Sequence, residues 1–348
     1  MISMRLIQLI LVALLVRGDA SAGVEGLQSE HLPLLFGNSP EVVLGKRDEG
    51  LIFGRVSDIA VGPGGDIYVV DSGFAVVHHF RSPDEYVGAF GTTGEGPGEF
   101  TMPLSIAVDP NDGNVWIGNM HGRICEYTAN GEVIDDIRFS WHGVRLVRSV
   151  AVAPGGELYV VSPNVLDNTM VHAFSQEGTL LRSFATTYAH EDPESDPYDE
   201  MTYAQGFLDV RGDRVFYVQK NPLEVRLYDL EGASLQTIRD PGFGVPYPPK
   251  ILQPDGRRIK HSLEGAWGIV ALPRSGFLLN IVIPRSDELP VGSSIVVEFD
   301  DSGSVVRQEE FQTPLFVAES APDGAIWAYD NQPFSRVFRF PGSESSAP

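Results

Sequence analysis

Polar side chains stand at the ends of short apolar runs that recur along the chain. The residues at these positions are Asp58, Asp71, Ser105, Asn119, His121, Ser162, Gln219 and Asp330. Most of them carry carboxylate, amide or hydroxyl oxygens, which suit a hard cation such as calcium or a hydroxyl-rich ligand. The best candidates for calcium ligands are Asp58, Asn119 and Asp330. A fold that brings these ends together would create a polar binding site.

A structural interpretation competes with this site at Asp71. An aspartate at a tight turn often caps its own backbone, and the sequence Asp71-Ser72-Gly73 fits that role by itself. The sequence leaves both interpretations open.

Other chemistries have less support. A zinc site needs three or four ligands, whereas His121 is the only histidine expected near the other candidates, because His78 and His172 fall in matching runs farther away. The Ser, His and Asp residues show no nucleophile-elbow pattern, so a triad hydrolase is not expected. The glycines of residues 91–98 lack a strand-to-helix context, so a phosphate site is not expected either.

The elements that position these residues come from a repeat. The clearest copy covers residues 59–71, where Ile-Ala-Val-Gly-Pro-Gly-Gly-Asp leads into Ile-Tyr-Val-Val-Asp. Five further copies begin at Ile106, Val150, Phe207, Ile269 and Ala318. A regular period of about 50 residues is typical of repeat architectures such as propellers.

Each copy divides into four short runs rich in β-branched and aromatic residues and separated by turn signals. In the second copy, for example, Asn130-Gly131 is a hairpin signal between two such runs. Helical periodicity is nearly absent. We therefore expect an all-β fold, a six-bladed β-propeller with four antiparallel strands per blade. The loops that enter the innermost strands and leave the second strands would open on one face, around the central channel.

The two ends of the propeller are predicted to meet. The sixth copy ends at Phe340 after its third run and lacks a fourth. Residues 41–45 resemble residues 87–91, the fourth run of the first copy, so the N-terminal strand is expected to close the last blade. The propeller then covers residues 23–340, and residues 341–348 are expected to form a disordered tail.

The first 22 residues have the features of a secretory signal peptide. Arg5 precedes the apolar stretch 6–16, and Ala20-Ser21-Ala22 forms a small-residue cleavage site. Because that stretch is too short to span a bilayer, we expect residues 1–22 to be cleaved and the protein to be secreted or periplasmic, with no membrane insertion afterwards. Cys125, the single cysteine, cannot form an internal disulfide and is expected to be buried and inert.

The net charge of −22 argues against nucleic acid or anionic lipid as the main partner, because both need clustered Lys and Arg. A soluble, self-repelling exported protein explains this charge, and a cationic ligand is the alternative. Three segments depart from the repeat: 185–204, 240–264 and 284–293. In the first, the acidic run 191–200 either binds calcium or a basic peptide, or is a solvated loop.

Two segments resemble NHL-repeat propellers, a family that includes many exported bacterial six-bladed propellers. They are residues 68–73, Tyr-Val-Val-Asp-Ser-Gly, and residues 90–100, Phe-Gly-Thr-Thr-Gly-Glu-Gly-Pro-Gly-Glu-Phe. The likeness covers nearly the whole mature chain and implies the fold more strongly than a function.

Our leading expectation is a non-catalytic, monomeric binding scaffold that takes a peptide, protein or glycan on its channel face and needs no cofactor. The alternative is a calcium-dependent lactonase or esterase-like hydrolase, or a lyase. The resemblance implies that lactonases of similar shape use Glu, Asn and Asp around calcium, and Asn119 and Asp330 could play two of those parts.

Overall fold

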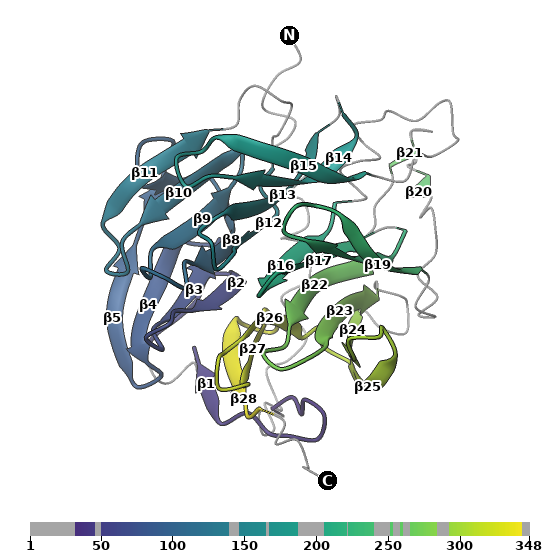
Figure 1. Cartoon of the computed structure of the whole chain (residues 1–348). Helices are drawn as coiled ribbons and strands as arrows, with labels where there is room; N and C mark the ends of the chain where they lie inside the picture. The colour runs from purple at the N-terminus through teal and green to yellow at the C-terminus, as the bar shows by residue number, and fades with distance from the viewer. Residues whose placement is uncertain are drawn as a thin grey trace. The chain divides into compact units, whose positions relative to one another are not determined.

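The six repeat copies form six four-stranded antiparallel sheets, the blades of a propeller (Figure 1). The structure is a computed structural model that describes residues 32–45, 50–138, 146–164, 167–186, 205–220, 222–239, 251–252, 258–259, 265–283 and 292–342. The propeller lies within the compact unit Pro33–Pro348. The predicted fold class is confirmed.

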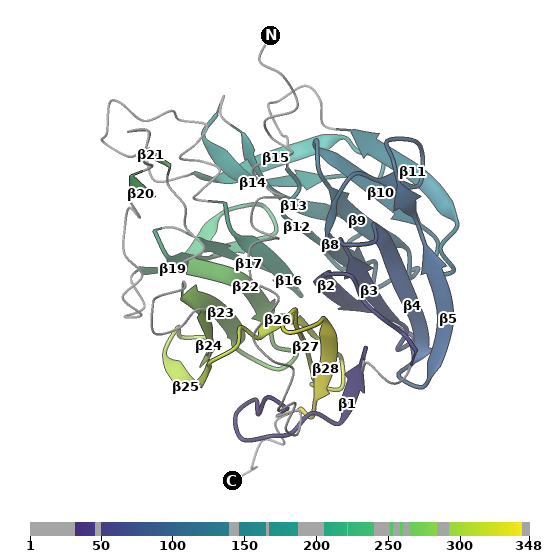
Figure 2. The same cartoon turned by 180° about the vertical axis from the view of Figure 1, so that it is seen from behind.

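In the first three blades the strands follow one another from the innermost to the outermost position. They are β2 (Val56–Val61), β3 (Ile67–Asp71), β4 (Val76–Ser82) and β5 (Glu85–Phe90); β8 (Pro103–Val108), β9 (Val115–Asn119), β10 (Arg123–Tyr127) and β11 (Val133–Arg138); and β12 (Ser149–Val152), β13 (Leu158–Asn164), β14 (Thr169–Phe174) and β15 (Leu180–Thr186). The inner strands lie around the centre and the fourth strands at the outside in both cartoon views (Figures 1 and 2).

The last three blades keep this order, with one strand borrowed from the start of the chain. They are β16 (Phe207–Arg211), β17 (Arg214–Gln219), β18 (Glu224–Asp229) and β19 (Ser234–Arg239); β22 (Gly265–Ala271), β23 (Phe277–Ile283), β24 (Ser293–Phe299) and β25 (Val305–Phe311); and β26 (Phe316–Ser320), β27 (Ile326–Asp330), β28 (Arg336–Phe340) and β1 (Val42–Leu44). Two short ladders lie outside the blades: β6 (Thr92–Thr93) with β7 (Glu99–Phe100), and β20 (Ile251–Leu252) with β21 (Arg258–Ile259).

Burial follows the place of a strand within its blade. All of β3 is buried, whereas the outermost β5 is mostly exposed, because only the inner strands have neighbouring blades on both faces. The third strand of each of the first five blades carries a buried aromatic side chain: Phe80, Tyr127, Phe174, Tyr228 and Phe299. Cys125 is also buried, and burial raises the pKa of its thiol to about 12, so it is not a nucleophile at neutral pH.

The turn between the first two strands of a blade depends on glycine. The Gly65 amide donates to the Gly62 carbonyl at 2.9 Å, and Gly65 has φ of 90°. The same turn recurs in the sixth blade, where Gly324 has φ of 85° and its amide donates to Ala321. A residue with a Cβ is strained in this left-handed region, which explains the repeated Pro-Gly or Asp-Gly signal.

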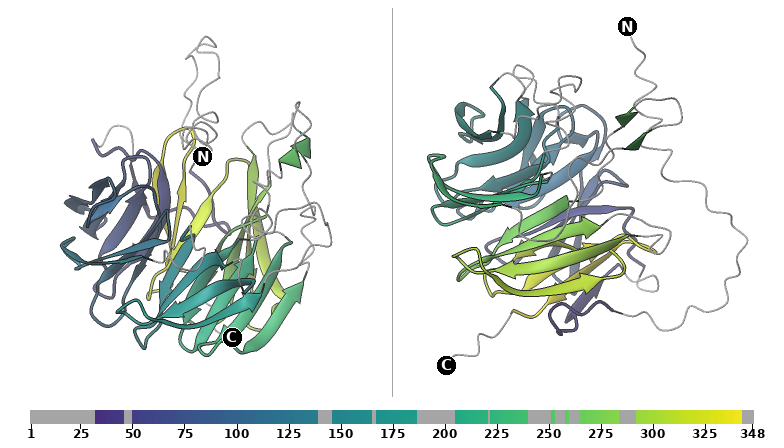
Figure 3. Two further views of the ribbon diagram at one scale, coloured as in Figure 1. Left: turned by 90° about the horizontal axis from the view of Figure 1, so that it is seen from above. Right: turned by 90° about the vertical axis from the view of Figure 1, so that its right-hand side faces the viewer.

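The N-terminal strand closes the ring, as predicted. β1 pairs antiparallel with β28, with Val43 opposite Phe338, and the sixth blade therefore combines the purple and yellow ends of the colour bar (Figures 1 and 3). Leu44 is buried in one core cluster with Phe53, Trp327 and Val337. This pairing leaves no unpaired third strand in the last blade, which removes an exposed sheet edge.

Some expected boundaries differ from the structure. Ala185 and Thr186 complete β15 rather than opening an insertion, Ser293 begins β24, and the inner strand of the fifth blade starts at Gly265 instead of Ile269. In each case the backbone ladder extends beyond the apolar run that marks the strand in the sequence. The expected signal peptide 1–22, residues 187–204 and most of the other two insertions lie outside the described residues, as do residues 343–348 of the expected tail.

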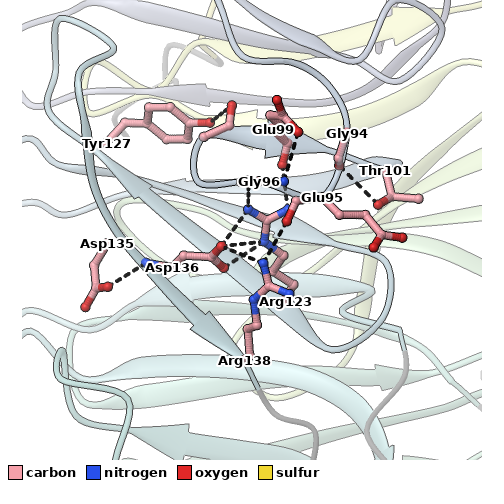
Figure 4. Close-up of polar contacts among 11 residues, drawn as sticks. Gly94, Glu95, Gly96, Glu99, Thr101, Arg123, Tyr127, Asp135, Asp136 and Arg138 are labelled. Carbon is pink, nitrogen blue, oxygen red and sulfur yellow. Dashed lines mark hydrogen bonds and ion pairs between the residues drawn. The ribbon is translucent and has the colours of Figure 1, made fainter.

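The glycine-rich link between the first two blades is held by a buried arginine (Figure 4). Arg123 donates from Nε to both carboxylate oxygens of Asp136, at 2.7 and 2.8 Å, and from its terminal nitrogens to the carbonyls of Glu99 and Gly96. The Gly96 amide in turn donates to the Glu99 carboxylate at 2.8 Å. The carbonyls of Glu99 and Gly96 and the amide of Gly96 in this link therefore have hydrogen-bond partners within the chain.

No helix long and apolar enough to cross a membrane occurs within the described ranges.

Candidate functional site

The sequence-predicted polar residues fall at one end of each blade, where second strands end and inner strands begin. Asp71 lies at the end of β3, and its carboxylate accepts from the backbone amides of Gly54 at 2.6 Å and Arg55 at 2.9 Å. It also accepts from Gly73 and Phe74 in its own turn. Burial alone would raise the pKa of Asp71, but hydrogen bonds from His78 and these amides lower it. The carboxylate is thus fully used in holding the chain around the turn.

Three further candidates are engaged within their own blades. The Asn119 side-chain oxygen accepts from the amides of Met102 and Met120, at 2.8 and 2.9 Å. Asp330 forms a buried ion pair with Arg336, with Oδ2 and a terminal nitrogen 2.5 Å apart. Gln219 is fully buried, and its amide nitrogen donates to the Pro222 carbonyl at 3.1 Å.

The remaining candidates do not converge on one point either. The hydroxyls of Ser105 and Ser162 are buried without a hydrogen-bond partner in the structure, and His121 is exposed in the turn between β9 and β10, with φ of 64°. Among the described residues, no group of three or more His, Cys, Asp or Glu side chains is placed to hold a metal ion.

Asp58 differs from the other candidates because its carboxylate bridges two blades at the propeller axis. It accepts from the Ile59 amide on its own strand at 2.9 Å and from the Ile106 amide on β8 at 3.0 Å. Inner strands have no partner on their axial side, so their amides need such acceptors. Asp209 on β16 repeats the arrangement, accepting from the Ala271 amide of β22 at 2.8 Å.

Glu319 on β26 is the third carboxylate of this kind, and it accepts from the Ser320 amide at 2.8 Å. Burial, followed by repulsion from Asp209 and Asp58, raises its pKa. Burial also raises the pKa of Asp58 to about 7 and that of Asp209 to about 6. Asp58 and Asp209 therefore bind protons closer to neutral pH than ordinary aspartates do.

Aromatic side chains line the same end of the fourth, fifth and sixth blades. The ring centroids of Phe207 on β16 and Trp267 on β22 are 6.5 Å apart, and those of Trp267 and Phe316 on β26 are 6.0 Å apart. Phe316 stacks on Tyr329 of β27 at 5.1 Å. Trp267 occupies a β-bulge between Ala266 and Gly268, which takes it out of the regular ladder and lets its side chain point differently from its neighbours.

Two cations adjoin this aromatic row. The Arg148 guanidinium carbon, just before β12, lies 4.8 Å from the Phe207 ring centre and 5.0 Å from that of Trp267. The Lys220 ammonium nitrogen, just after β17, lies 4.3 Å from the Trp267 ring centre. We call these six residues the axial cluster: Arg148, Phe207, Lys220, Trp267, Phe316 and Tyr329.

The two cations of the axial cluster have no carboxylate partner among the described residues. No ion pair joins either side chain to an acidic residue there, and each is only partly buried. Burial, and then the charge of Arg148, lowers the pKa of Lys220 to about 7. Burial likewise lowers the pKa of Arg148. Burial therefore disfavours the charged form of both side chains, although the chain as a whole carries an excess of acidic residues.

The sequence pattern did not indicate the axial cluster, which lies at the same end of the blades as the predicted polar residues. Phe207 and Phe316 are the first residues of inner strands, and Tyr329 is next to the predicted Asp330. A large aromatic or cationic residue at the entry to an inner strand was the available signal. It recurs at Arg148, but the bulge that sets the position of Trp267 is not visible in the sequence.

Comparisons with known proteins agree with the architecture. The sequence model of a family described as "6-bladed beta-propeller" matches residues 44–253. A search of curated proteins found no significant match.

Among solved structures, that of U3-55K is 12% identical, with a TM-score of 0.53, and the alignment covers 86% of this chain and 81% of that one. The RRP9 WD40 repeats are 12% identical, with a TM-score of 0.52 and coverage of 85% and 78%. A streptogramin B lyase is 7% identical, with a TM-score of 0.50 and coverage of 83% and 84%. At these identities the likeness concerns the fold alone.

Proposed function

This chain belongs to the family described as 6-bladed beta-propeller, and we propose that it is an exported, NHL-repeat-like binding module whose ligand docks on the axial cluster. The observation that carries the proposal is the pair Arg148 and Lys220. Both adjoin the ring of Trp267, and neither has an acidic partner in the described part of the chain. A charge kept at a cost in stability is typical of a functional site.

The proposed ligand is a peptide, protein or glycan group that enters at the end of the blades where inner strands begin. Aromatic rings give contact area at low entropic cost, and Trp and Arg are frequent among residues that dominate binding energy. The signal-like residues 1–22 support a secreted or periplasmic location, and we propose a monomer. No catalytic role is proposed, because the candidate carboxylates and amides are engaged in turns, an ion pair and links between blades, and the candidates do not converge on one point.

The test is an unbiased binding screen of the mature protein with variants of the axial cluster. Immobilised glycans, peptides and metabolites would be screened with wild type, Trp267→Ala and Arg148→Met. The matched control is Phe74→Ala, because Phe74 is an exposed aromatic in the β3–β4 turn, at the same end of its blade but away from the axis.

Ligands that bind wild type and the control but neither cluster variant would support the proposal. Ligands that bind all four proteins with equal affinity would place the site elsewhere and overturn it. Circular dichroism of each variant separates lost binding from lost folding.

A further inference from the structure

The axial cluster also indicates which chemical group it recognises, an inference that rests on the proposed binding function. We propose that it binds an organic carboxylate joined to a flat apolar ring, with the carboxylate at Arg148 and Lys220 and the ring against Trp267 and Phe316. Hydrogen-bonding capacity, charge and shape of the axial cluster each support this ligand class.

The hydrogen-bonding capacity of the charged side chains indicates whether the ligand is an anion or a cation. The axial carboxylates already act as acceptors: both oxygens of Asp58 and both oxygens of Asp209 take backbone amides. Arg148 and Lys220, by contrast, make no hydrogen bond to another described residue through their charged groups. The charged groups with unused capacity are therefore donors, and donors of this type bind carboxylates most strongly.

Charge points the same way. The charge of Arg148 affects Lys220, and Arg55 adds a further positive charge near Arg148. The acidic groups around them are Asp58, which interacts with Arg148, and Asp209 and Glu319, which interact with Asp58 and have raised pKa values of their own. An anion between the two cations relieves their repulsion, whereas a cationic ligand would increase it.

The aromatic row defines the other half of the ligand. Phe207, Trp267 and Phe316 are partly exposed, and their centroids follow one another at 6.5 and 6.0 Å across three blades. The Tyr329 hydroxyl is already bonded to the Ser57 carbonyl at 2.8 Å and its ring stacks on Phe316, so Tyr329 supports Phe316 from behind. A flat ring can pack against the exposed parts of this row while its carboxylate reaches the two cations that lie over the Trp267 ring.

The experiment is a calorimetric titration of the mature protein at pH 6 with small probes that vary one property at a time. Phenylacetate carries both ring and carboxylate, acetate the carboxylate alone, benzyl alcohol the ring alone, and 2-phenylethylamine the ring with a positive charge. Glucuronate adds a carboxylate on a sugar ring, which distinguishes an aromatic source of the ligand from a glycan source.

We expect phenylacetate to bind saturably and the other four probes to bind at least about tenfold more weakly. Preferred binding of glucuronate would overturn the flat apolar ring and indicate a glycan source of the carboxylate. Arg148→Met and Lys220→Met should each weaken the preferred probe about tenfold or more, since each removes a charge-assisted contact. Arg307→Met is the matched control, because Arg307 also lies over an aromatic ring, 4.0 Å from Phe36, but at the outer strand β25. It should leave the affinity unchanged.

Two other results would overturn this inference. If benzyl alcohol or 2-phenylethylamine binds as well as phenylacetate, the cluster recognises rings without regard to charge. The proposed binding function would then hold, but the proposed recognition of a carboxylate would be wrong. If no probe binds wild type at millimolar concentration, the ligand class is wrong, and the screen with Trp267→Ala decides separately whether the axial cluster is a binding site.

Discussion

Replacing Lys220 by methionine should stabilise the protein at pH 6, although it removes a side chain of the axial cluster. Burial and then Arg148 lower the pKa of Lys220 from 10.5 to about 7. In the unfolded chain the ammonium titrates near its ordinary pKa. Between pH 7 and 10.5 the native chain therefore binds fewer protons than the unfolded one, so stability rises with pH in that window, and below it Lys220 is destabilising.

The magnitude follows from the shift and the exposure. A shift of about 3.5 pKa units corresponds to about 5 kcal/mol. Because Lys220 is only partly buried, water screens some of this cost, and we expect a gain of about 2 kcal/mol on substitution. Methionine keeps an apolar stem beside Trp267 without the charge. For a domain of this size the gain raises Tm by about 3 °C.

The assay is thermal and urea denaturation of wild type and Lys220→Met at pH 6, 8 and 10. The gain should be full at pH 6, smaller at pH 8 and close to zero at pH 10. Lys220→Arg is the control, because it keeps a charge that does not titrate in this range and should give no gain. A methionine variant that is less stable than wild type at pH 6, or a gain that does not change with pH, would refute the reasoning.

Three further outcomes can be measured on the same protein. Arg123→Met should cost about 3–5 kcal/mol in urea denaturation because it leaves Asp136 with only its longer contact to the exposed Arg138 and leaves the Glu99 and Gly96 carbonyls without this donor, whereas Arg138→Met should change stability by about 0.5 kcal/mol or less; equal effects would contradict the role of Arg123 in holding the glycine-rich link. Asp58, whose pKa is raised to about 7 from 3.8, binds a proton more readily in the native state, so stability should fall as pH rises from 4 to 7, and Asp58→Asn should flatten that part of the profile measured by urea denaturation. Deleting residues 23–50 should abolish folding because β28 loses its partner strand, and an unchanged Tm of the truncated protein would exclude this closure.

The apolar runs and turn signals were sufficient to predict the six blades. Short-range patterns determine where the strands form. The alternation of β-branched residues, the glycine turn at Gly65 and the aromatic ring of Phe80 each act within one hairpin or between adjacent blades. The closure by β1 could also be predicted, because the missing fourth run after Phe340 and the unmatched run near Val42 complement each other.

The candidate site could be predicted only in part. The sequence identified the correct end of the blades, because inner-strand entries and second-strand exits are fixed by the repeat. It left the capping role of Asp71 open. It could not show that the Asn119 side chain accepts from backbone amides or that Asp330 pairs with Arg336, because only the folded turns bring these partners within hydrogen-bonding distance. Asp58 was the exception, as its carboxylate lies at the axis.

The sequence by itself determined the fold class, the number of blades and the way in which the ring closes, because each depends on local patterns that repeat. Only the tertiary structure decided the site. The axial cluster joins Arg148 of the third blade, Lys220 of the fourth and Trp267 of the fifth. These residues meet because the ring brings the entries of successive inner strands together. The lowered pKa values of Arg148 and Lys220 result from burial and, for Lys220, from the nearby charge of Arg148, which no local pattern encodes.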